Sequence, residues 1–231
     1  MEAERGAAPA WGLGDAAVGF LVGLLVSGLV AGTWAAVSGS TRVTLGALAA
    51  SQAGLWVGLL GAPVLASRRK GTGDLGQDFG LRARWSDTAL GVPVGVLCQL
   101  VLVPLIYLPL HDLVSRKELE APVRRVTNRA HGVGFFVLAV VVIVGAPVVE
   151  ELFFRGLVLR SLRRRFGDGW AVAGSAVAFG LAHFEPLQLP ALVALGVVLA
   201  LLALRTGRLG PSVFAHAAFN AVTIIALALQ R

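Results

Sequence analysis

Long apolar runs separated by short polar segments make up most of this chain. Runs without charge, close to the ~20 residues that cross a bilayer, extend over Ala16–Thr41, Val43–Ser67, Thr88–Leu110, Ala130–Val149, Gly169–Phe184, Pro186–Leu204 and Leu209–Gln230. Such runs are typical of transmembrane helices, because a helix satisfies its backbone hydrogen bonds internally. The pattern predicts an all-α, polytopic bundle of about seven membrane-spanning helices.

The composition supports a membrane protein. Hydrophobic residues make up 56% of the 231 residues and charged residues only 14%, which is too apolar for an ordinary soluble domain. The net charge is +7, but the basic residues lie between the apolar runs, so membrane lipids and not nucleic acid are the expected partners. A single cysteine, Cys98, excludes a disulfide framework and a cysteine-cluster metal site.

The basic residues also predict an orientation. Lys and Arg follow the second, fourth and sixth runs, in the segments 68–84, 160–165 and 205–208. If the runs alternate across the membrane, these segments share one side, and their positive charge predicts that this side is cytoplasmic. The connection 111–129 is also basic and would then lie outside. A short amphipathic or re-entrant element there would change the parity.

Glycines recur at four-residue spacing within the runs, a spacing that lets two helix backbones approach closely. The pairs are Gly19/Gly23, Gly28/Gly32, Gly54/Gly58 and Gly91/Gly95. We expect these pairs to pack helices within the bundle, and they leave the oligomeric state open.

Charged residues follow the fourth run at one place. Glu150 and Glu151 come directly after an apolar segment, Arg155 comes four residues after Glu151, and apolar residues continue beyond it. Each charge inside a membrane costs at least ~2.5 kcal/mol and therefore needs a partner or a use. On a helix Arg155 shares a face with Glu151, whereas Glu150 is rotated by roughly 100°. We predict a Glu151–Arg155 ion pair that is turned away from the site and a free Glu150 carboxylate within it.

Two further runs carry polar groups at helical spacing. Phe179 and His183 share a face of one run, and His216 and Asn220 share a face of the last run. A carboxylate can take a proton from water, an imidazole can position the water or stabilise charge, and an Asn amide can donate to an oxyanion. Together these groups suit the hydrolysis of an amide bond. Glu and His also bind Zn²⁺, so a metal site stays open at this point.

The candidate residues form three motifs in chain order: Glu150-Glu151-x-x-x-Arg155, Phe179-x-x-x-His183 and His216-x-x-x-Asn220. In this order, within an otherwise uncharged background, they resemble the signatures of the type II CAAX prenyl endopeptidases and their bacterial relatives, the CPBP (Abi) intramembrane proteases. The resemblance covers roughly residues 130–229. It divides the chain into N-terminal helices at 1–129 and a catalytic core at 130–231.

The resemblance implies an intramembrane endopeptidase of the bacterial cytoplasmic membrane that cleaves a peptide or a prenylated or otherwise lipid-modified protein. It implies that Glu150 activates water with help from His183, and that His216 and Asn220 stabilise the oxyanion. Glu151, Arg155 and Phe179 would support them. We expect no obligatory metal; if one is present, Glu150, His183 and His216 would hold it. The alternatives are a non-catalytic scaffold or immunity protein and a small transporter.

The depth of the site follows from the end of the fourth run. With the basic segment 160–165 at one interface, Glu150 lies roughly 15 to 22 Å inside at ~1.5 Å per residue. Pro147 predicts a kink just before Glu150, because its ring removes a backbone hydrogen bond. We expect Glu150, His183, His216 and Asn220 to line one water-accessible cavity that opens to the cytoplasmic side.

Overall fold

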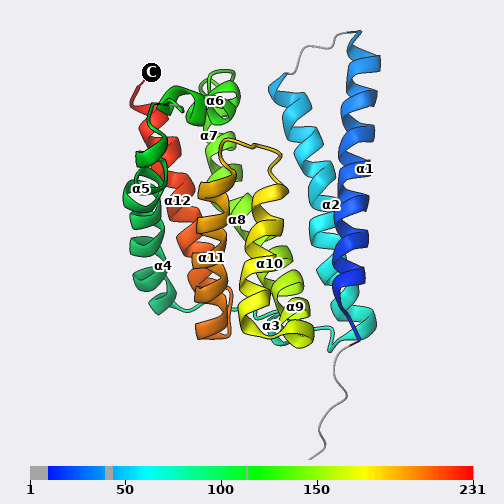
Figure 1. The fold of residues 1–231 in the computed structure, drawn as a ribbon. Coiled ribbons are helices and arrows are strands. Elements are labelled where there is room, and N and C mark those ends of the chain that lie inside the picture. The colour runs from blue at the N-terminus through cyan, green and yellow to red at the C-terminus, as the bar shows by residue number, and fades with distance from the viewer. Residues whose placement is uncertain (1–9, 40–43, 113, 231) are drawn as a thin grey trace, which may run out of the picture.

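The computed structural model describes residues 10–39, 44–112 and 114–230, and this part of the chain contains helices and no strand. Two long helices, α1 (Leu13–Ser38) and α2 (Leu45–Lys70), form a hairpin at one side of the molecule (Figure 1). The rest of the chain forms a bundle beside this hairpin, and all the candidate site residues lie there.

That bundle is built from segments that join into longer rods. In chain order they are α3 (Leu75–Asp78), α4 (Trp85–Leu97), η1 (Cys98–Leu102), α5 (Val103–Tyr107), η2 (Leu108–Leu110), α6 (Arg116–Thr127), α7 (Val133–Val140), η3 (Val141–Gly145), α8 (Ala146–Glu150), η4 (Glu151–Val158), α9 (Leu159–Phe166), α10 (Asp168–Leu181), α11 (Leu189–Thr206) and α12 (Gly210–Ala228). The segments η1, η3 and η4 are π-helical, and η2 is a 3₁₀ turn.

Within the described residues, six helices are long and apolar enough to cross a membrane: Leu13–Ser38, Leu45–Lys70, Trp85–Leu110, Val133–Phe166, Leu189–Thr206 and Gly210–Ala228. The predicted all-α, polytopic bundle is confirmed. The predicted number of about seven membrane-spanning helices agrees roughly with the six found among the described residues. The remaining predicted run corresponds to α10, which has only 14 residues. It stands in the bundle and packs against η4, α9 and α11 (Figure 1).

The three basic segments that we predicted to share one side lie at one end of the bundle, called the basic end here (Figure 1). Arg160 Nη2 donates to the Gly207 carbonyl at 2.9 Å, and Arg208 forms an ion pair with Asp87 at 2.5 Å. The amphipathic element expected in the 111–129 connection is α6, which lies at the opposite end (Figure 1). The chain enters and leaves α6 at that end, so α6 leaves the alternation of the long helices unchanged.

Most of the glycine pairs pack helices against each other, as predicted. A Cβ on Gly58 would lie 2.1 Å from the Gly19 carbonyl oxygen, so α1 and α2 could not approach as they do with a larger residue. A Cβ on Gly95 would lie 2.0 Å from the Ala215 carbonyl oxygen of α12. The prediction is wrong for Gly28/Gly32, because a Cβ on either residue meets nothing within 4 Å. This part of α1 turns its glycines away from α2.

The long helix Val133–Phe166 departs from α geometry on both sides of Pro147. Its segments η3 and η4 are π-helical and flank the short α8. Proline lacks an N–H and crowds the preceding turn, which is a known cause of such departures. The structure shows a local change of helix geometry around Pro147, and the kink predicted there stays a prediction. The same order occurs before Pro104, where η1 precedes α5.

Candidate active site

Glu151 and Arg155 form an ion pair in the interior of the bundle. Arg155 Nη1 donates to Glu151 Oε1 at 2.8 Å, and neither side chain has exposed surface. Arg155 Nη2 also donates to the Gly196 carbonyl at 3.2 Å, and the guanidinium carbon lies 4.3 Å from the Phe179 ring centroid. The predicted pair is confirmed, and its cation is further stabilised by a carbonyl and an aromatic face.

His216 lies between the two glutamates. Its Nδ1 is 3.0 Å from Glu151 Oε1, and its Nε2 is 3.8 Å from Glu150 Oε2. The prediction that Glu151 turns away from the site is therefore wrong, because Glu151 contacts His216 as well as Arg155. A π turn contains more residues than an α turn, so successive side chains are rotated less from each other. Both glutamates can therefore reach one imidazole.

Phe179 connects the two histidines. Its ring is fully buried and makes edge contacts with His183, at 4.7 Å between centroids, and with His216, at 5.5 Å. His183 Nδ1 is 2.7 Å from the Phe179 carbonyl oxygen. A carbonyl only accepts, so Nδ1 carries a hydrogen, and in the neutral ring Nε2 keeps its lone pair. The predicted helical pairing of Phe179 and His183 is thus present.

Asn220 follows His216 by one turn of α12, but its amide bonds to the backbone of another helix. Its Nδ2 donates to the carbonyl of Val142, in η3, at 2.8 Å. Four candidate residues, from the first and third motifs, thus take part in two contacts between the same pair of helices. His216 joins α12 to Glu150 and Glu151, and Asn220 joins α12 to η3.

Burial around the site is uneven. The segment 151–159, on the side of the basic end, is buried throughout, whereas Glu150, His183 and Asn220 are half-buried. At the basic end, Phe79 and Leu209 are fully buried, and the Leu209 N–H donates to the Gly80 carbonyl at 2.7 Å. These contacts hold the segment after α3 against the start of α12. The burial pattern favours access from the α6 end, and the opening predicted on the cytoplasmic side stays a prediction.

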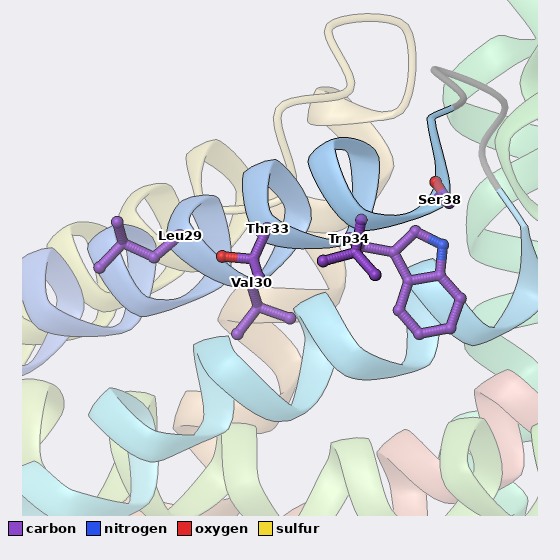
Figure 2. A pocket seen from close by; sticks show the side chains of 6 residues that line it. Leu29, Val30, Thr33, Trp34 and Ser38 are labelled. Atoms are coloured by element: carbon purple, nitrogen blue, oxygen red, sulfur yellow. The ribbon is translucent and has the colours of Figure 1, made fainter.

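An apolar cavity of about 470 Å³ lies between α1, η4 and α10. Its lining includes Phe20, Phe153, Ala182 and Phe184, and the last two flank His183 in the chain. A second cavity, shown in Figure 2, is lined by α1 residues between Leu29 and Ser38 and by no candidate residue. A cavity lined by Glu150, His183, His216 and Asn220 together stays a prediction.

The candidate residues do not fit a metal site in this geometry. Across residues 10–39, 44–112 and 114–230, no group of three His, Cys, Asp or Glu side chains is placed to hold a metal ion. The set that we named for a metal, Glu150, His183 and His216, is therefore not gathered around one point. The contacts of His216 Nδ1 with Glu151 and of His183 Nδ1 with a carbonyl leave Nε2 of each ring as the nitrogen that could bind a metal.

Two residues that hold the loop after His183 were missed by the sequence analysis. Tyr107 Oη donates to the Leu187 carbonyl at 2.5 Å, and Gln188 Nε2 donates to the Leu119 carbonyl at 2.7 Å. Each is a polar residue near the end of an apolar run, which signals a need for a hydrogen-bond partner. Their partners are backbone groups far along the chain, and these leave no pattern in the sequence.

Comparison with known proteins gives one match to a protein family. Residues 132–222 match the model of a family described as type II CAAX prenyl endopeptidase Rce1-like. This segment is similar to that family. The Rce1-like segment runs from the start of α7 into α12 and contains every candidate residue named above. The chain therefore carries a domain of a membrane peptidase family within a helical membrane protein.

One curated relative and the solved structures complete the comparison. The relative is "Putative membrane peptidase YdiL" of Bacillus subtilis (strain 168), which is 32% identical over 79 residues. The match covers 34% of this chain and 32% of the relative, so the chain spans about a third of that protein's length. No solved structure matches the chain significantly. The division at residues 129 and 130 stays a prediction.

Proposed function

We propose that this protein is an intramembrane endopeptidase that hydrolyses a peptide bond with a glutamate-activated water. Its substrate is a peptide or a prenylated or otherwise lipid-modified protein. The observation that carries the proposal is the position of His216, held at 3.0 Å from the paired Glu151 and 3.8 Å from the half-buried Glu150. At 3.8 Å no atom fits between the carboxylate and the imidazole, but a water molecule or a carbonyl oxygen beside them can contact both groups.

In the proposed reaction, Glu150 takes a proton from water while the water oxygen attacks the peptide carbonyl. His183 Nε2, which keeps its lone pair, accepts a hydrogen bond from the same water and orients it. His216 and Asn220 donate to the oxyanion that forms on the carbonyl oxygen. The C–N bond then breaks, and Glu150 returns its proton to the leaving amine, so no net proton is gained or lost by the enzyme.

Glu151 and Arg155 serve this reaction through His216. Glu151 accepts the hydrogen on His216 Nδ1, which fixes the ring orientation and directs Nε2 toward Glu150. With a hydrogen on each ring nitrogen, His216 donates through Nδ1 to Glu151 and through Nε2 to the oxyanion. Arg155 neutralises the buried charge on Glu151. Phe179 packs against both imidazoles and limits their motion.

We further propose that the protein lies in a bacterial cytoplasmic membrane with its basic end in the cytoplasm, as the distribution of Lys and Arg favours. The peptide then approaches Glu150 from the α6 end, on the side where the candidate residues are half-buried. The cytoplasmic opening expected from the sequence stays the alternative prediction. The apolar cavity beside Ala182 and Phe184 is suited to an apolar part of the substrate.

The experiment measures cleavage of a peptide library and of a farnesylated peptide by the purified protein in lipid vesicles. We expect product from the wild type, and no turnover from Glu150→Ala or His183→Ala at unchanged Tm. The matched control is Asp168→Ala, which removes an exposed carboxylate at the basic end and should retain activity. A parallel reaction with a chelator tests for a metal. Activity in the Glu150→Ala variant would overturn the mechanism, and no product from any substrate would favour a scaffold or a transporter.

A further inference from the structure

One backbone carbonyl in the long helix of the site loses its partner because of a proline. In η3 the N–H of Ala146 bonds to the Val141 carbonyl, five residues earlier. The next bond of this series would run from residue 147 to the Val142 carbonyl. Residue 147 is proline, which has no N–H to donate. The Val142 carbonyl therefore needs a donor from elsewhere, because an unpaired carbonyl in apolar surroundings is costly.

Asn220 supplies that donor. Its Nδ2 lies 2.8 Å from the Val142 oxygen, and it comes from α12, the helix that also carries His216. We propose that Asn220 is a positioning residue, which replaces the hydrogen bond missing at Pro147 and thereby holds Glu150 in place relative to His216. The consequence for turnover rests on the proposed function, whereas the contact itself does not.

The Asn220–Val142 hydrogen bond lies where it can hold Glu150 in place relative to His216. Asn220 is one turn from His216 on α12, and Val142 lies two turns before Glu150 on the opposing helix. His216 and Asn220 therefore attach α12 to this helix on both sides of Pro147. Without Asn220, the part of the helix before Pro147 still packs against α12 but loses this hydrogen bond to it, and the 3.8 Å separation of His216 Nε2 and Glu150 Oε2 is less firmly held.

An Asn amide has two hydrogens on Nδ2, so one can bond to Val142 while the other points to the reaction. A direct donor to the oxyanion and a positioning residue differ in one respect. The positioning role depends on Pro147, since any other residue at 147 would supply a backbone N–H for Val142. The direct role does not depend on the residue at position 147.

The test is a double-mutant cycle that combines Asn220→Ala with Pro147→Ala, read out as Tm and as kcat and KM. With Pro147 present, we expect Asn220→Ala to lower Tm by roughly 2–10 °C, because the partly buried Val142 carbonyl is left unpaired. We expect kcat to fall about 10- to 100-fold with little change in KM, as for a displaced catalytic group. In the Pro147→Ala background, Asn220→Ala should lower Tm by less than half as much as it does with Pro147 present. The factor by which Asn220→Ala lowers kcat should be smaller there by about fivefold or more.

Pro104→Ala provides the matched control, because Pro104 also follows a π segment but lies on another helix. It should leave the effect of Asn220→Ala on Tm unchanged. Equal losses of Tm in the wild-type and Pro147→Ala backgrounds would overturn the proposal. Equal losses of kcat in the two backgrounds would overturn its catalytic part and assign Asn220 to the oxyanion alone. If the wild type shows no turnover, the proposed function fails, and the Tm cycle still decides this inference.

Discussion

The buried pair of Glu151 and Arg155 provides the strictest test of the folded structure. Both side chains have no exposed surface, and Arg155 Nη1 donates to Glu151 Oε1 at 2.8 Å. Changing Arg155→Met keeps a long apolar side chain but leaves the Glu151 carboxylate buried with only His216 as a polar partner. Removing one member of a buried pair typically costs ~3–5 kcal/mol of unfolding free energy. For a chain of this size, that corresponds to a fall in Tm of roughly 6–20 °C.

The double variant Glu151→Gln with Arg155→Met separates the charge from the packing. It removes both charges, and the Gln side-chain oxygen can still accept the hydrogen of His216 Nδ1. Replacing both members of a buried pair by neutral groups is often close to neutral in stability. We therefore expect the double variant to recover most of the unfolding free energy that Arg155→Met loses. The coupling free energy between the two substitutions should then be about 2 kcal/mol or more.

Stability is measured on the purified protein in detergent, by thermal unfolding and by equilibrium unfolding in a denaturing detergent. Arg155→Lys is the matched control, since it keeps the charge and loses only the planar guanidinium. The unfolding free energy of Arg155→Lys should lie between those of the wild type and Arg155→Met. The reasoning is refuted if Arg155→Met costs less than about 1 kcal/mol, or if the two substitutions are simply additive, because neither result is compatible with a buried, uncompensated carboxylate.

Two further predictions concern packing and orientation. Gly58→Ala should lower the free energy of unfolding by about 1–3 kcal/mol, because its Cβ would lie 2.1 Å from a carbonyl oxygen of α1. The control is Gly28→Ala, whose Cβ would meet no atom within 4 Å, and it should be neutral or slightly stabilising. Both are measured by thermal unfolding. The orientation is tested by labelling single cysteines in a Cys98→Ala background with a membrane-impermeant maleimide. A cysteine in place of Arg163 should react only from the cytoplasmic side, and a cysteine in place of Glu185 only from the other side. Reaction of both from one side would show that the basic end and the His183 loop are not on opposite sides of the membrane.

Much of the fold can be predicted from local sequence patterns, without tertiary information. Apolar runs of sufficient length form helices in a bilayer wherever they occur, because the backbone must satisfy its own hydrogen bonds there. The Glu151–Arg155 pair could also be predicted, since residues four apart on one helix are neighbours in any fold. The approach of α1 to α2 at Gly58 was likewise expected from glycine spacing. The identical spacing of Gly28 and Gly32 shows that the pattern permits close packing without requiring it.

Contacts between helices were decided only by the tertiary structure. Helical spacing places His216 and Asn220 on one face of α12, but the neighbours of that face depend on the rotation and depth of α12 in the bundle. These are set by close approaches such as Gly95 to the backbone of Ala215. The result is that His216 reaches Glu151 as well as Glu150, and that Asn220 bonds to Val142. The contact between the segment after α3 and the start of α12 arises in the same way, from hydrogen bonds between residues far apart in the chain, and such bonds leave no periodic signal in a single sequence.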